Sequence, residues 1–273
     1  MENLVPVPPS EDEIQQALTA LEPTRRQRIL RKLIMAALGS VPWVGGILTA
    51  IQSYGEEDGQ LRSNLLQSQW LEEHRKKFKE LTEDIAEIIN RLQSTKAEIE
   101  DRLESEEYLV LVRKAFHTWD QADTAEKRAH IKRLIANAGA STLCPDDLIR
   151  LFLDWLALYH EAHFLVIREI YKAPGVTRAD IWQAIHGDFP REDSAEADLF
   201  KLLIRDLSTG SVIRQHREAN YHGQFVKKSL TKRPSSGVLK SAFDDEEGYE
   251  LTALGRQFVH YVFTEVVPKI NNS

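Results

Sequence analysis

The sequence predicts a mainly α-helical protein whose C-terminal part also contains short strands. Residues 60–138 form a run of 79 residues without glycine or proline, the two residues that a helix interior tolerates least. Within this run apolar residues recur every seven positions, as they do along the apolar side of a coiled coil. After residue 160 the pattern changes to short helices and alternating, strand-like segments. We therefore expect a helical bundle with a long coiled-coil-like helix, followed by a small α+β domain.

Composition and charge set limits on location and function. The chain has 273 residues, 42% of them hydrophobic, which is enough for a real core, and a net charge of −7 at pH 7. Positive charge gathers in residues 211–240, which hold seven basic residues and one acidic residue. The single cysteine, Cys144, forms no intramolecular disulfide, and the first apolar run begins only at residue 33, unlike a secretory signal. We expect a cytoplasmic protein, with the inner face of a membrane as an alternative location.

Residues 1–59 are expected to form a proline-containing lead and an apolar helical hairpin. Helices are predicted at 11–22 and 25–38, and a third from Trp43 to Tyr54. Gly39 and Pro42 separate the second from the third, because glycine suits the end of a helix and proline cannot continue one.

Residues 33–55 carry no charged side chain and follow five basic residues. As one helix this stretch would span about 35 Å, enough for a bilayer, but its internal glycines and proline disfavour a plain transmembrane helix. A buried hairpin and a segment that inserts into a membrane only conditionally remain as alternatives. The candidate membrane-interacting residues are Arg25, Arg26, Arg28, Arg31, Lys32, Ile34, Trp43, Ile47, Leu48 and Tyr54.

Residues 60–160 are expected to form the long helix and the rest of the bundle. An apolar seam is predicted along Leu71, Phe78, Ile85, Leu92 and Ile99, covered by the chain's own helices or by a second copy. A break is expected near Gln121, because Asp123 and Glu126 have capping-box spacing, and Gly139 is expected to end the next helix. From Pro145 onward we expect one continuous apolar helix that reaches residue 171.

Residues 161–273 show a regular order of short elements. A helix capped by Thr177 and Asp180 is followed by a second helix that ends at Gly210. Residues 211–218 and 224–228 alternate like strands, and a further strand then leads through a Thr252 cap into a closing helix.

This order, and the segment Leu251-Thr252-Ala253-Leu254-Gly255-Arg256, resemble known proteins. Residues 161–263 are similar to the winged helix-turn-helix superfamily. The segment resembles the strand-to-helix junction of prokaryotic regulators in the multiple-antibiotic-resistance and phenolic-acid-repressor groups. The resemblance implies a winged-helix domain that contacts DNA or another protein. Residues 1–160 are similar only in general outline to helical pore-forming proteins.

The candidate nucleic-acid contacts are Lys201 and Arg205, at outward positions of the second helix, and a group of wing residues that could each neutralise a phosphate: Arg214, Arg217, Lys227, Lys228, Lys232 and Arg233. Glu196 and Asp198 lie in the first turn of the helix that would read bases, where they would repel the DNA backbone. Any binding is therefore predicted to be weak, sensitive to salt and little dependent on base sequence.

We expect no catalysis, metal or cofactor. His160 and His163 are three residues apart, whereas the zinc-protease motif has two histidines four apart. The sequence thus predicts a non-catalytic protein in which a partner-sensing winged-helix domain controls N-terminal helices that act on an anionic membrane or in self-assembly. The alternative is a winged-helix DNA-binding regulator that dimerises through residues 60–104.

Overall fold

A computed structural model describes residues 25–46, 65–94, 99–217 and 241–263. The described residues are mainly helical and contain one small antiparallel sheet. The chain divides into two compact units: residues 1–157 together with 261–273, and residues 158–260.

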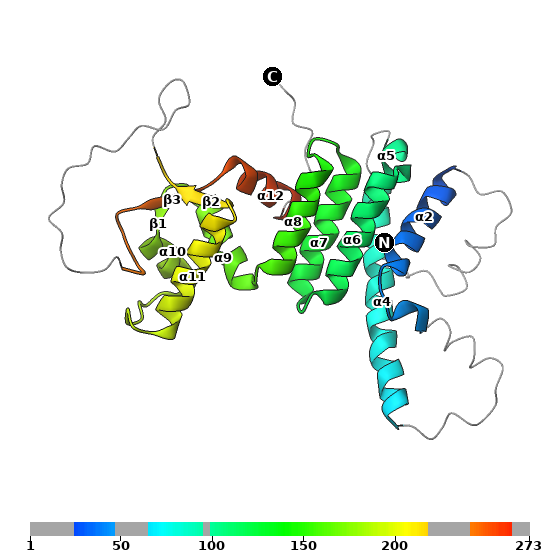
Figure 1. Ribbon diagram of the computed structural model, residues 1–273, viewed down its shortest axis with the longest axis horizontal. Coiled ribbons are helices and arrows are strands. Elements are labelled where there is room, and N and C mark those ends of the chain that lie inside the picture. Colours follow the sequence, from blue (N-terminus) through cyan, green and yellow to red (C-terminus); the bar gives the residue numbers. More distant parts are fainter. Residues whose placement is uncertain (1–24, 47–64, 95–98, 218–240, 264–273) are drawn as a thin grey trace, which may run out of the picture. The chain divides into compact units, whose positions relative to one another are not determined.

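The first unit is a helical bundle. Its helices are α2 (Arg25–Gly39), α4 (Leu65–Ser94), α5 (Glu100–Glu104), α6 (Glu106–Gln121), α7 (Ala125–Ala140) and α8 (Asp146–Leu158). Helix α7 packs against both α4 and α6, and α2 packs against α6, so that these helices lie side by side (Figure 1). The apolar side of α4 thus has a partner within its own chain.

The predicted long helix over residues 60–104 is interrupted. Helix α4 ends at Ser94, and Ile99 precedes the short helix α5 with a backbone ψ of 0°. The side chain of Ser105 then accepts a hydrogen bond from the Tyr108 N–H and starts α6. A run without glycine or proline permits a continuous helix, but a serine that satisfies the free N–H groups of a new first turn can still begin another one.

The predicted break near Gln121 is confirmed, because α6 ends at that residue. The cap of the next helix is Thr124, whose side chain accepts from the Lys127 N–H, and not Asp123 as we predicted. Gly139 does not end this helix, which continues to Ala140. A Cβ at Gly139 would lie 2.5 Å from the Tyr108 hydroxyl oxygen, so glycine is needed here for close packing.

Polar contacts join α4 to α6 and α7. The Trp119 Nε1–H donates to Asp84 at 2.7 Å, and the Lys132 ammonium lies 2.7 Å from both Asp84 and Glu87. The Trp119 side chain is fully buried, so its N–H requires such an acceptor. Near α8, burial and the charge of Asp146 raise the pKa of the Cys144 thiol to about 11.

The predicted continuous helix from Pro145 to residue 171 is wrong. Helix α8 ends at Leu158, and α9 (Glu161–Lys172) begins after His160. The His163 Nδ1 accepts a hydrogen bond from the His160 backbone N–H at 3.1 Å. This side chain satisfies a backbone group at the start of α9 and so favours a new helix over a continued one.

The second unit combines helices with a three-stranded sheet. After α9 come β1 (Val176–Thr177), α10 (Arg178–His186), α11 (Ala195–Thr209), β2 (Ile213–Gln215), β3 (Gly248–Leu251) and α12 (Ala253–Phe263). The strand order is β1-β3-β2, with both pairs antiparallel. In β3, Tyr249 lies opposite Val176 on one side and Gln215 on the other. Strand β3 is therefore the centre of the sheet.

Three predicted helix boundaries in this unit are confirmed, at the start of α10, the end of α11 and the start of α12. Thr177 and Asp180 form a capping box at α10, Gly210 follows the last residue of α11, and the Ser194 side chain caps the start of α11. The Thr252 hydroxyl accepts from the Gly255 N–H and donates to the Ser211 carbonyl oxygen, which joins the start of α12 to the start of β2. Strand β1 was not predicted, and the expected strand at 224–228 lies outside the described residues.

Candidate cationic cleft

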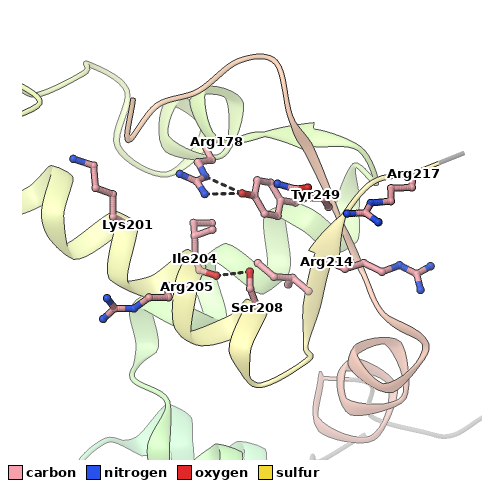
Figure 2. Close-up of a pocket in the computed structure, with 10 residues that line it drawn as sticks. Arg178, Lys201, Ile204, Arg205, Ser208, Arg214, Arg217 and Tyr249 are labelled. Carbon is pink, nitrogen blue, oxygen red and sulfur yellow. Dashed lines mark hydrogen bonds between the residues drawn. The ribbon is translucent and has the colours of Figure 1, made fainter. Parts of the chain in front are cut away.

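A cleft of about 500 Å³ opens in the second unit between α11, the start of α10 and the sheet (Figure 2). Its lining residues are Arg178, Lys201, Ile204, Arg205, Ser208, Ile213, Arg214, Gln215, Arg217 and Tyr249. Five of these ten carry a positive charge and none carries a negative one. A cleft lined by one sign of charge focuses the electric field and attracts ligands of the opposite charge.

Helix α11 supplies one wall of the cleft by its periodicity. Lys201, Ile204, Arg205 and Ser208 have spacings of three and four residues, so they share one side of the helix. The adjacent side of the helix is buried through Phe200, Leu203 and Leu207, and Ile204 is buried at the border between the two sides. The helix is thus fixed by its apolar side, while Arg205 and Ser208 are exposed at the cleft.

The sheet supplies the other wall. In β2, Ile213 is buried, while Arg214 donates from Nε to the Glu250 carboxylate at 2.6 Å. The other oxygen of that carboxylate lies 2.9 Å from the His216 Nδ1. Burial alone would raise the pKa of Glu250, but the hydrogen bonds with His216 and Arg214 outweigh it and lower that pKa. Glu250 therefore stays ionised and holds Arg214 at the edge of the cleft.

Arg178 and Tyr249 lie between the two walls. The Arg178 Nε and Nη2 groups both donate to the Tyr249 hydroxyl oxygen, at 2.9 and 2.7 Å. The guanidinium carbon is also 5.4 Å from the centre of the tyrosine ring. These contacts fix the orientation of the Arg178 side chain.

One end of the cleft is acidic. The Lys201 ammonium lies 3.6 Å from Glu192 and 3.8 Å from Asp198. Glu192 also accepts hydrogen bonds from Ser241 and from the Ala242 N–H, which anchors the chain that leads into β3. The first turn of α11 is thus less attractive to an anion than its C-terminal half.

The structure brings four of the predicted nucleic-acid contacts, Lys201, Arg205, Arg214 and Arg217, to one cleft. The other four predicted contacts, Lys227, Lys228, Lys232 and Arg233, lie outside the described residues. Sequence reasoning missed Arg178, which follows the Thr177 cap and gave no local sign of a binding role. Its place in the cleft depends on the pairing of β1 with β3, 71 residues away in sequence.

Several candidate membrane-interacting residues make contacts within the bundle. Arg25 forms ion pairs with Glu100, Asp101 and Glu104, and Lys32 lies 3.7 Å from Glu104. The Trp43 Nε1–H donates to Asp120 at 2.7 Å.

The remaining candidates of this group differ in exposure. Arg28 and Arg31 are exposed and Ile34 is half-buried, whereas the Arg26 side chain and residues 47, 48 and 54 are not described. Among the described residues, no helix has the length and apolar character needed to cross a membrane.

The seam residues are covered to different degrees. Ile85 and Leu92 are buried, while Phe78 and Ile99 are half-buried. The side chain of Leu71 lies outside the described residues. Leu81 and Ile88, on the same side of α4, are buried as well, in keeping with the packing of this helix against α7.

Within the described ranges, no three His, Cys, Asp or Glu side chains gather as a metal site would require. Comparison of the chain with protein-family models, with curated proteins and with solved structures gave no match.

Proposed function

We propose that the second unit is a winged-helix module that binds the phosphate backbone of nucleic acid in the cationic cleft. The observation that carries this proposal is the presence of five basic side chains, and no acidic one, among the ten lining residues. The element order and the sheet order β1-β3-β2 support a winged-helix arrangement, in which α11 takes the place of the recognition helix.

The spacing of the charges favours an extended polyanion over a single small anion. In Figure 2 Lys201 and Arg205 extend from α11 on one side of the cleft, Arg214 and Arg217 lie on the opposite side, and Arg178 lies between them. Cations spread across a cleft in this way cannot all surround one anion, but they can contact successive phosphates of one backbone.

The cleft offers few side chains that could recognise individual bases. Apart from Tyr249, its uncharged polar side chains are Ser208, which donates to the Ile204 carbonyl, and Gln215, which bonds with Glu247. The acidic first turn of α11 would also oppose approach of that end of the helix to a backbone. The proposed binding is therefore weak and independent of base sequence, as contacts to phosphate alone carry no sequence information.

The test is fluorescence anisotropy with a short DNA duplex, measured from about 50 to 200 mM salt. Arg205→Ala combined with Arg217→Ala should weaken binding and reduce the salt slope by about 0.9 for each phosphate that the protein no longer neutralises. Arg191→Ala is the matched control, because Arg191 is 85% exposed and does not line the cleft. Equal affinity and slope in the double variant and the control would contradict the proposal.

Membrane insertion by the N-terminal region stays a prediction. Leu33, Ala37, Val41 and Val44 are buried, so insertion would require this part of the bundle to open. Co-sedimentation with anionic vesicles after mild acid treatment tests it, and absence of vesicle binding under those conditions would remove it.

A further inference from the structure

The Arg178 guanidinium has a defined edge available for a ligand. An arginine carries five N–H donors in one plane. Tyr249 accepts from Nε and from one N–H of Nη2, which together form one side of the fork. The end of the fork, with one N–H from Nη1 and one from Nη2, has the spacing that matches two oxygens of a phosphate.

The partner that orients Arg178 is itself fixed. Tyr249 is only 3% exposed and lies in the central strand of the sheet, paired with both neighbours. Its hydroxyl oxygen accepts both N–H bonds from Arg178 and retains its own proton for donation. Arg178 is also the first residue of α10, whose capping box holds the first turn in place.

We propose that Arg178 and Tyr249 form a subsite for one phosphate group at the base of the cleft. Arg178 donates two N–H bonds from the end of its fork to two phosphate oxygens, and the Tyr249 hydroxyl donates a third bond. This inference rests on the proposed function, and it assigns to Arg178 the contact that orients a phosphate within the cationic cleft.

Arg205 and Lys201, on α11, are held less firmly than Arg178. The Arg205 side chain is 72% exposed, and its contact with the neighbouring Asp206 is 3.8 Å long. Lys201 has a single ammonium group, which acts as a point charge. Such residues attract a backbone without selecting the orientation of a phosphate.

Substitution of arginine by lysine separates these roles, because it keeps the charge and removes the fork. Arg178→Lys should weaken duplex binding about tenfold, since the paired hydrogen bonds to a charged group no longer form, and should leave the salt slope unchanged. Arg205→Lys, the matched control in the same cleft, should leave both unchanged. Equal affinities for the two lysine variants would overturn the subsite.

Tyr249→Phe should reduce affinity several-fold with an unchanged salt slope, because it releases Arg178 and removes one donor. Its melting temperature shows whether the fold is retained. If this variant is folded and binds as the unchanged protein does, the tyrosine has no part in the subsite and the proposal fails.

A second measurement does not depend on DNA. In the full chain with ¹⁵N-labelled arginine, orthophosphate should shift the side-chain Nε–H signal of Arg178, identified by its loss in Arg178→Lys, more than chloride at equal ionic strength. If DNA does not bind but this shift occurs, the proposed function fails and the phosphate subsite stands. If phosphate causes no shift beyond that of chloride, the subsite is refuted whether or not DNA binds.

Discussion

Replacement of Gly255 by alanine should destabilise the second unit and disturb the cleft. A Cβ at this position would lie 2.1 Å from the Val212 carbonyl oxygen, whereas real Cβ contacts are essentially never shorter than 3.0 Å. The backbone must therefore separate by roughly 1 Å, and overpacking of this kind costs about 1–3 kcal/mol. The same oxygen accepts the Thr252 N–H at 3.0 Å, so a weakened hydrogen bond adds about 1 kcal/mol. We expect a total loss of about 2–4 kcal/mol.

Trp182 allows the loss of stability to be measured in the second unit alone. It is the one tryptophan of residues 158–260, so its ¹⁹F signal after 5-fluorotryptophan labelling follows urea unfolding of that unit. Gly255→Ala should lower the urea midpoint of this signal and also weaken DNA binding, because Val212 leads into the strand that carries Arg214. Gly39→Ala is the control, since no atom lies within 4 Å of its added Cβ. An unchanged midpoint in Gly255→Ala would refute the packing argument.

Three further predictions concern the first unit. Burial and a nearby arginine lower the pKa of His130 from 6.5 to about 4, so the unfolded chain takes up a proton first as pH falls. About 2–4 kcal/mol of stability should therefore be lost between about pH 6.5 and 4. In urea titrations His130→Gln should remove this pH dependence, whereas the control His117→Gln, at an exposed histidine, should retain it. Ile85→Asp places a carboxylate at a position that is 7% exposed and should lower the melting temperature and loosen the bundle, whereas an unchanged melting temperature would show that α4 does not need this contact. Asp84→Ala leaves a buried indole N–H without its acceptor and should cost about 2–4 kcal/mol, while Glu83→Ala, at a side chain 46% exposed, should change stability by less than about 0.5 kcal/mol. Similar losses in these two variants would contradict the assigned role of Asp84.

The sequence was most informative where a single residue type decides a helix end. Thr177, Ser194 and Thr252 each accept a hydrogen bond from an N–H three residues later, and Gly210 follows the last turn of α11. These contacts depend on neighbours in sequence, so spacing alone predicts them.

The predictions that were wrong or incomplete concern positions where two local structures compete, or where a contact joins residues distant in sequence. Ser105 and His160 begin new helices inside segments whose apolar periodicity continues on both sides, and periodicity alone cannot reveal such a break. Arg178 reaches the candidate site because a two-residue strand pairs with β3 across a long sequence separation. The basic side of α11 was predictable from its spacing, but the residue that completes the cleft was not.

Because Cys144 is buried, a second cysteine can be added for site-specific labelling without replacing the native one. Thiol reagents attack the thiolate, and a pKa near 11 leaves very little of it at neutral pH. The sole cysteine of the chain should therefore remain unlabelled under native conditions. A cysteine introduced at the exposed Thr209, one residue beyond the cleft residue Ser208, would then take up a spin label or fluorophore selectively. Such a probe would report occupancy of the cleft directly, without removal of the native cysteine.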